Sequence, residues 1–344
     1  MTIVEKKKNN DGITTYIVKK DMTDEQAEKR LLNKFVTASM INHILKDDAD
    51  VYTDDGELLL RFRKNIIPNK HSESFYDNVI KFALTPTSNR GSATGSKSKN
   101  IYENPKIMTN IFGYFDRFSP IQKKKFRDAK IKLPLEVRDC RFNRDYPEQY
   151  KETLPLLHDI DRLYKKYVPT RYIKQNTKAK QTPFNIPGTS FTTVTTNVNF
   201  RTSIHTDKGD DVEGFGNLVV IEDGKYTGAE TCFPQYGIGV DLRKGDILFM
   251  DVHKLHGNLP MTPVDKNARR LSIVCYLREN VWKRTKGKSV AFMKKHNELI
   301  RSVTNINKTP KHNPKHNPKH NKTHKHNKKH KHNKTHKHNK THKH

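Results

Sequence analysis

Residues 189–207 read TSFTTVTTNVNFRTSIHTD and combine a strong strand pattern with a chemical motif. The first twelve of these residues alternate in character and are rich in β-branched threonine and valine, which predicts a β-strand. The stretch ends in His205-Thr206-Asp207. Side chains two residues apart on an extended chain point to the same face, so His205 and Asp207 are a candidate pair of metal ligands.

Short apolar runs continue after this motif, and turn residues such as Asp223-Gly224 separate them. No helical pattern lies between these runs, which favours strands joined by tight turns. The pattern predicts an α+β fold whose core is an antiparallel double-stranded β-helix, a barrel of the jelly-roll or cupin type. The strands predicted after the motif are residues 217–222, 237–242, 247–252 and 271–276.

A second histidine completes the candidate metal site. His256 lies 49 residues after Asp207 and directly follows an apolar run. Two imidazoles and one carboxylate on one face of Fe(II) leave three positions open, which is the ligand set of non-haem iron oxygenases. His253 competes for the third position, but Gly257 gives the backbone around His256 more freedom. The predicted iron ligands are therefore His205, Asp207 and His256.

Arg270 and Ser272 are predicted to hold a co-substrate. Arg270 follows His256 by fourteen residues, and the two side chains share one face of a predicted strand while Arg269 faces the other way. A guanidinium fork beside a hydroxyl suits the far carboxylate of 2-oxoglutarate, because bidentate Arg–carboxylate pairing is strong and directional. No catalytic side chain beyond the metal ligands is required, since the metal and the co-substrate carry the oxidation.

These segments resemble the TET/JBP group of Fe(II)- and 2-oxoglutarate-dependent dioxygenases, which oxidise the methyl group of pyrimidine bases in DNA. The resemblance implies iron binding by the three ligands and 2-oxoglutarate binding by Arg270 and Ser272. The cysteine-rich, zinc-binding elements of animal TET enzymes are absent, so the chain is closer to the compact, JBP-like form. The runs that carry the likeness are NFRTSIHTDKGD (199–210), GIGVD (237–241), GDILFMDV (245–252), LHGN (255–258) and RLSIV (270–274).

The substrate implied by the resemblance is thymine or 5-methylcytosine in DNA. Arg201 and Asp210 flank the ligand pair and are candidate substrate contacts, although a structural turn or a surface salt bridge would explain them equally well. Two other functions stay open. The same oxygenase chemistry could act on a protein side chain or a small molecule, or the chain could be a catalytically dead DNA-binding barrel. The intact ligand set argues against the dead barrel.

Residues 1–140 are predicted to form a mostly helical accessory region. Residues 24–32 carry acids first and bases last, as the dipole of a helix favours. Residues 85–100 are predicted to be a flexible Gly/Ser/Lys loop, either a linker or a clasp for phosphates. The oxygenase domain is expected over residues 141–304 and begins with a helix at 146–167, where apolar residues recur at helical spacing.

The C-terminal segment 305–344 is predicted to be a disordered tail. From residue 308 onward it contains 13 lysines, 11 histidines and no acidic residue, so it cannot bury enough apolar surface to fold. Its histidines are expected to bind divalent metals non-specifically. Without these lysines the formal net charge of +29 falls to +16, a surplus that favours DNA as a partner.

The remaining composition indicates an intracellular protein, cytoplasmic or nuclear. Cys140, Cys232 and Cys275 are odd in number and share no metal-ligand spacing, so we expect buried free thiols without disulfide partners. The first residues contain no apolar core of signal-peptide length, and no apolar run is long enough to cross a membrane.

Overall fold

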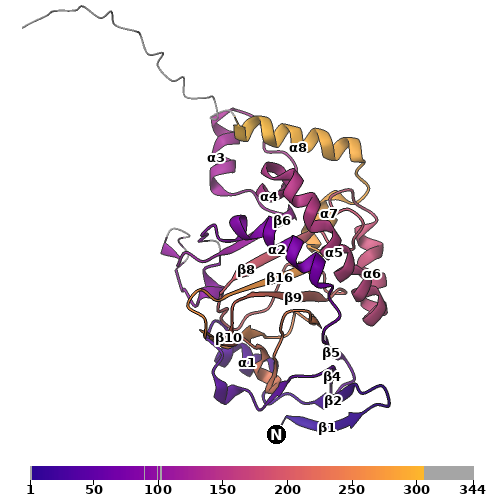
Figure 1. The fold of residues 1–344 in the computed structure, drawn as a ribbon. Helices are drawn as coiled ribbons and strands as arrows, with labels where there is room; N and C mark the ends of the chain where they lie inside the picture. Colours follow the sequence, from indigo (N-terminus) through magenta and orange to yellow (C-terminus); the bar gives the residue numbers. More distant parts are fainter. Residues whose placement is uncertain (1, 89, 99, 101–102, 306–344) are drawn as a thin grey trace, which may run out of the picture. The chain divides into compact units, whose positions relative to one another are not determined.

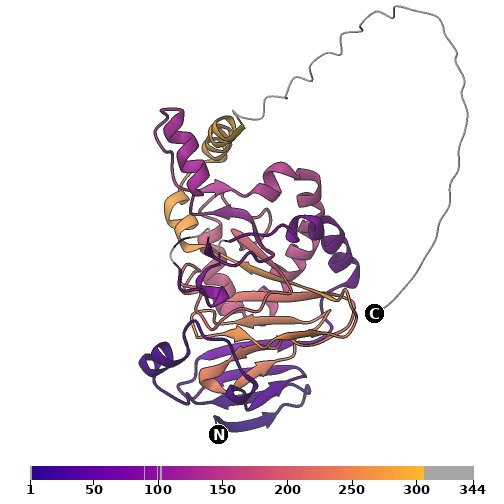
Figure 2. The same cartoon turned by 90° about the vertical axis from the view of Figure 1, so that its left-hand side faces the viewer.

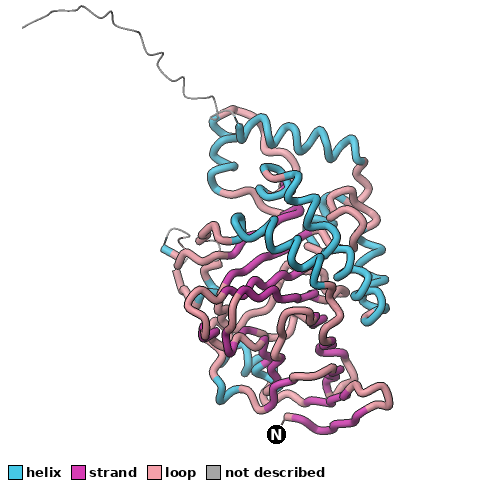
Figure 3. Tube along the Cα trace, in the orientation of Figure 1, coloured by secondary structure: helices cyan, strands magenta, loops and turns pink. Residues whose placement is uncertain are grey.

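The computed structural model describes residues 2–88, 90–98, 100 and 103–305. These residues lie in one compact unit, Met1–Asn305. Apart from Asn305, which ends a helix, the predicted disordered and metal-binding tail at 305–344 lies outside the described residues. In the described part, most helices gather over one face of a large sheet, and further strands lie on the other face of that sheet (Figure 1, Figure 3).

The large sheet contains ten strands that come from both halves of the unit. Neighbouring strands are antiparallel except β2 and β4, which pair in parallel. In spatial order the strands are β1 (Ile3–Lys8), β2 (Thr14–Val18), β4 (Ala49–Thr53), β5 (Leu58–Arg63), β13 (Ile247–Met250), β9 (Gly216–Asp223), β16 (Arg269–Tyr276), β8 (Thr193–Val198), β6 (Thr109–Phe115) and β7 (Arg138–Asp139).

A smaller four-stranded sheet lies against part of this large sheet. Buried Leu218 and Leu248 of the large sheet share one apolar cluster with Phe233 and Ile238 of the small sheet. This face-to-face packing leaves room for a cavity between two layers of strands. The small sheet has the order β14 (Gly257–Asn258), β11 (Thr231–Phe233), β12 (Ile238–Val240), β3 (His43–Leu45), and a separate pair joins β10 (Tyr226–Gly228) to β15 (Met261–Pro263).

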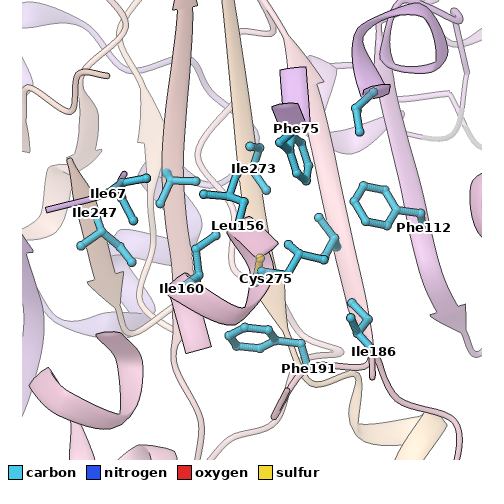
Figure 4. Close-up of a cluster of buried hydrophobic side chains, with 14 of the residues drawn as sticks. Ile67, Phe75, Phe112, Leu156, Ile160, Ile186, Phe191, Ile247, Ile273 and Cys275 are labelled. Carbon is cyan, nitrogen blue, oxygen red and sulfur yellow. The ribbon is translucent and has the colours of Figure 1, made fainter. Parts of the chain in front are cut away.

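Helices cover the opposite face of the large sheet. The predicted helix at 146–167 is confirmed as α5, which begins at Pro147, where the missing N–H of proline removes no helical hydrogen bond. Its Leu156 and Ile160 are buried against Phe75 of a second helix and Ile273 of β16 (Figure 4). The helices of this layer include α2 (Asn69–Ala83), α4 (Arg141–Asp145), α5 (Pro147–Tyr167) and α6 (Pro169–Ala179).

The strands predicted after the motif are confirmed as β9, β12, β13 and β16, and β8 confirms the strand that precedes it. A mixed α+β fold with a large sheet is therefore confirmed. Period-two alternation sorts the side chains of β16 between the helices and the small sheet. Leu271 and Ile273 belong to the helix-side cluster, while Arg270 and Ser272 line the cavity. Arg269 points away from the cavity and pairs with Asp223 at 3.5 Å.

The prediction that residues 1–140 are mostly helical is wrong, because seven strands lie there. Backbone hydrogen bonds to distant partners decide these strands: β5 pairs with β13, nearly two hundred residues further along the chain. A local pattern cannot show such pairing. The helix predicted at 24–32 is confirmed as α1 (Asp24–Leu31), which Thr23 and Gln26 cap reciprocally.

Three further helices lie at one end of the unit, beyond the sheet edge formed by β6 and β7 (Figure 1, Figure 2). Buried Phe118 and Phe126 pack with Ile300 and Val303 and join the first helix to the last. No helix among the described residues is long and apolar enough to span a membrane. The three cysteines are buried and free, as predicted. These helices are α3 (Pro120–Asp128), α7 (Glu279–Thr285) and α8 (Val290–Asn305).

Candidate metal centre

The two predicted histidine ligands are brought together by their own backbones. His205 and His256 form an isolated antiparallel bridge in which each N–H donates to the carbonyl of the other at 2.9 Å. The ring centroids lie 4.5 Å apart. His205 follows β8 of the large sheet, and His256 directly precedes β14 of the small sheet, so the bridge joins segments that belong to the two sheets.

Each imidazole is oriented by a hydrogen bond from its inner nitrogen. Nδ1 of His205 donates to the carbonyl of Ser203 at 2.7 Å, and Nδ1 of His256 donates to the carbonyl of Lys254 at 2.9 Å. A carbonyl only accepts, so both rings carry the proton on Nδ1 and present an unprotonated Nε2. This arrangement is how proteins fix the tautomer of a metal-binding histidine.

Asp207 completes the cluster. Its two carboxylate oxygens lie 3.7 Å from Nε2 of His205 and 3.7 Å from Nε2 of His256. The candidate ligand atoms of all three residues lie within 4.8 Å of one another. Burial opposes ionisation of Asp207, but the neighbouring imidazoles outweigh burial and lower the pKa of the carboxyl. Burial and His205 lower the pKa of His256 to about 4, which leaves it neutral near pH 7.

The competing histidine lies outside this cluster. The ring of His253 is directed at the carbonyl of Asp211, with Nε2 at 3.3 Å from that oxygen. Gly257 has no positive φ, so conformational freedom is not its role. A Cβ there would come within 3.1 Å of a methyl of Val36, so glycine permits close packing beside His256. The geometry thus groups His256, and not His253, with the other two predicted ligands.

A cavity of about 290 Å³ opens beside the cluster, between the two sheets. Strands of both sheets contribute to its wall, with Asn197 from β8, Thr231 from β11 and Ser272 from β16. Most of the residues that line the cavity are polar or charged, with a few apolar side chains such as Leu218, Met250 and Val274 among them.

The predicted co-substrate residues face into this cavity. Arg270 is 7% exposed and has no acidic partner within ion-pair distance among the described residues, and its buried Nε lacks a hydrogen-bond partner. Burial lowers the pKa of Arg270. A buried cation without a counter-ion is costly, and a bound carboxylate would remove that cost. Asn197 donates to the hydroxyl of Ser272 at 3.2 Å, which fixes Ser272 beside the guanidinium.

A second charged group lies on the cavity wall near the cluster. Arg278 donates to Asp116 at 2.9 Å and lies 3.5 Å from Asp210, one of the two predicted substrate contacts. A Cβ on Gly209 would lie 2.1 Å from the guanidinium, so only glycine allows this approach. Burial and the nearby Asp207 raise the pKa of Asp210 well above its usual value.

The other predicted substrate contact is placed differently. Arg201 stacks on Phe35 at 4.6 Å and donates to the carbonyl of Val36 at 2.8 Å. It is not among the residues that line the cavity. Its contacts join the metal-ligand segment to residues 35–36, and its role towards a substrate stays a prediction.

Three arginines of the cavity, Arg90, Arg117 and Arg278, were not singled out from the sequence. Arg278 continues the even-numbered positions of β16 that face the cavity, and extending that alternation would have identified it. Arg90 comes from the predicted 85–100 loop and donates to Thr195 at 3.2 Å. Ser203 donates to the carbonyls of Ser92 and Ala93, both at 2.8 Å, so this loop is attached beside His205.

A known family matches the region of the chain that contains this cluster. Residues 126–279 match the TET/JBP family model, described as the oxygenase domain of the 2OGFeDO superfamily. The match shows that these residues resemble the TET/JBP oxygenase domain. The matched TET/JBP region contains the whole histidine and aspartate cluster together with Arg270, Ser272 and Arg278.

Two curated relatives of the TET/JBP family are similar to this chain. The bifunctional helicase and thymine dioxygenase JBP2 of Leishmania braziliensis is 32% identical over 201 residues, 58% of this chain and 16% of that protein. The thymine dioxygenase JBP1 of Trypanosoma brucei brucei is 29% identical over 267 residues, 74% of this chain and 29% of that protein. The chain therefore spans less than a third of the length of these relatives.

Among solved structures, NgTET1 in complex with 5mC DNA is 14% identical, with a TM-score of 0.48 over 82% of this chain and 90% of that chain.

Proposed function

We propose that this protein is a dioxygenase that uses Fe(II) and 2-oxoglutarate to hydroxylate the methyl group of a pyrimidine base in DNA. One observation carries the proposal: His205, Asp207 and His256 converge beside buried Arg270, whose Nε has no hydrogen-bond partner among the described residues. The first group fits a divalent metal with open positions, and the second fits an anionic co-substrate. The TET/JBP family match supports this combination.

The two facing sheets support a double-stranded β-helix as the scaffold of the site. In this proposal the predicted domain at 141–304 supplies β8, β9, β13 and β16 of the large sheet and β11, β12 and β14 of the small sheet. Residues 1–140 extend both sheets with further strands, which keeps the cavity between two rigid layers.

Each side chain of the site has a separate task in the proposed reaction. Bound iron, with 2-oxoglutarate and dioxygen, supplies the oxidation of an unactivated C–H bond. His205, Asp207 and His256 would hold the metal, and the backbone bridge and the Nδ1 hydrogen bonds fix the two histidines in place. Arg270 and Ser272 orient the co-substrate through its far carboxylate.

We propose thymine rather than 5-methylcytosine as the base, because the guanidinium of Arg278 lines the cavity. The guanidinium of Arg278 can only donate hydrogen bonds. At the same position of the base, thymine presents the acceptor O4 and cytosine presents an amino group, which donates. An amino group directed at a guanidinium would leave two donors facing each other. The names of the two relatives, both thymine dioxygenases, agree with this preference. A base in a duplex must first be flipped out, at a cost of a few kcal/mol.

The test uses the full chain with Fe(II), 2-oxoglutarate and ascorbate on two duplexes, one containing thymine without 5-methylcytosine and one in which 5-methylcytosine carries the only methyl groups. Mass spectrometry of the digested nucleosides identifies the product, and succinate is measured in parallel. The variant His256→Ala should abolish the product, while His253→Ala, three residues away, should retain it.

Each outcome separates the proposed function from its alternatives. A hydroxymethylated base made by the wild type and absent with His256→Ala supports a DNA dioxygenase and identifies the base. Succinate formation without a modified base would transfer the same chemistry to a protein side chain or a small molecule. Absence of both products would favour a catalytically dead DNA-binding barrel.

A further inference from the structure

A basic ridge lies next to the cavity and is not used by the proposed chemistry. Seven lysines and arginines and one acidic residue, Asp128, occur between residues 117 and 132. Most of this segment is α3 with its flanking turns. We define the basic ridge as Arg117, Lys123, Lys124, Arg127, Lys130 and Lys132, all of which are exposed.

The helix presents these charges on one face. Pro120, Lys123, Lys124 and Arg127 have the spacing i, i+3, i+4, i+7 of a single helical face, and with Ile121 they border an open hollow. The opposite face carries Phe126, which is buried against α8. The apolar face therefore holds the helix on the protein and directs the cations to solvent.

Few of these cations are neutralised by the protein. Lys123 pairs with Glu136 at 2.5 Å and Lys124 with Asp128 at 2.6 Å, both at exposed positions. Surface pairs of this kind contribute about 1 kcal/mol or less, so a phosphate can replace the carboxylate. Among the described residues, the other four side chains of the basic ridge have no ion-pair partner.

The basic ridge is continuous with the cavity. Arg117 is exposed and lines the cavity, so it marks an opening, and α3 begins three residues later. Three residues span at most about 10 Å, and the face from Pro120 to Arg127 adds about 10 Å at the helical rise. That face matches roughly three phosphates of one DNA strand, which are spaced by about 3.4 Å along the axis.

We propose that the basic ridge binds the phosphate backbone of duplex DNA beside the target nucleotide. This inference rests on the proposed function, because a strand whose base occupies the cavity can then pass the opening at Arg117. Phosphates are repeated, exposed anions, which is the charge pattern that a row of exposed cations on one helical face complements. The contacts are with the backbone and so position the DNA without reading its sequence.

The test compares two triple variants of the full chain, both still carrying the C-terminal lysines. The ridge variant is Lys123→Gln, Lys124→Gln, Arg127→Gln. The control variant is Lys151→Gln, Lys165→Gln, Lys174→Gln, which removes three exposed cations from α5 and α6 on the helix side of the sheet. Lys174 pairs with Glu213, so the control also disrupts a surface ion pair.

Binding of a fluorescent duplex is measured by anisotropy at several salt concentrations without iron or 2-oxoglutarate. Loss of three phosphate contacts should reduce the slope of log K against log salt by about 2.7 in the ridge variant. The control variant should keep the wild-type slope, and equal melting temperatures would show that both variants fold. In turnover assays the ridge variant should raise KM for DNA and leave kcat unchanged at saturating DNA.

An unchanged slope in the ridge variant, or an equal loss in the control variant, would overturn the inference. So would loss of binding to phosphatidylserine vesicles while binding to DNA is kept. Failure of the proposed function can be distinguished from failure of this inference, because the salt dependence of DNA binding is measured without turnover. A wild type that binds DNA through the basic ridge but modifies no base would contradict the proposed function and leave the ridge as a DNA contact.

Discussion

The two faces of strand β16 differ in the partners that their side chains have. Leu271, Ile273 and Cys275 are buried in an apolar cluster under the helices. On the cavity face, Arg270 is also buried, but its Nε has no hydrogen-bond partner among the described residues. The side chains of the helix face have all their packing partners without a ligand, whereas Arg270 on the cavity face has room for a bound anion. We conclude that the helix face stabilises the fold and that the cavity face gives up stability in order to bind a ligand.

The largest expected effect is on the cavity side. Replacing Asp207 with alanine removes the carboxylate ligand, so we expect the variant to bind no stoichiometric iron and to form no detectable product. Iron content after metal loading and succinate formation are the two measurements. Asp223→Ala, which removes an exposed carboxylate from β9, serves as the control. Normal turnover by the Asp207 variant would contradict a metal site on the cavity face.

The helix side should respond in stability instead. Ile273→Ala creates a cavity under α5 and is expected to lower the free energy of unfolding by about 2–5 kcal/mol, the usual cost of such a truncation. Val274→Ala, the neighbour on the cavity face, is only partly buried and should cost less. Urea denaturation measures both. An equal loss in the two variants would show that the faces do not differ in packing.

At Arg270, stability and ligand binding should change in opposite directions. Arg270→Met removes a buried cation that has no ion-pair partner among the described residues, so the melting temperature of the ligand-free protein should rise. Binding of 2-oxoglutarate should weaken by at least about 2 kcal/mol, roughly 30-fold. Calorimetry measures both quantities. Arg269→Met, on the exposed side, should leave both unchanged, and a destabilised Arg270→Met protein would contradict the argument.

The smallest effect concerns the charged pair at the end of β16. Burial opposes ionisation of Asp116, but Arg278 outweighs it and lowers the pKa of the carboxyl below its ordinary 3.8. A depressed acidic pKa stabilises the folded state above the unfolded pKa, and this contribution disappears as the pH falls below it. Asp116→Asn should therefore cost about 1.5 kcal/mol at pH 7 and progressively less below pH 3.8.

Denaturation of both proteins between pH 2 and pH 7 checks this pH dependence. A difference that stays constant over the whole range would show that the hydrogen bonds of Asp116, and not its charge, stabilise the pair.

Much of the C-terminal fold could be predicted from local sequence. The alternation in residues 189–200 and 271–276 predicted β8 and β16, and apolar residues at helical spacing predicted α5. The same alternation placed Arg270 and Ser272 on one face, which is the cavity face in the structure. These features depend on neighbours two to four residues apart, and a sequence displays such neighbours directly.

The strands of residues 1–140 could not be predicted in the same way. Leu58–Arg63 reads LLLRFR and has no clear period, because β5 is covered on both faces and its neighbours in the sheet are β4 and the distant β13. Arg90 was visible only as one cation in a polar loop, and nothing local shows that this loop attaches to Ser203. Long-range hydrogen bonds decide both features.

The sequence by itself determined the residue types of the candidate metal centre and their spacing, because ligand chemistry and strand alternation are local properties. The tertiary structure alone decided that His256 joins His205 through a backbone bridge, whereas His253 turns away. It also decided that Arg278 lies beside Asp210 and that the basic ridge begins at the cavity opening. These relations join residues far apart in the chain, and only the packing of two sheets and a helix layer fixes such distances.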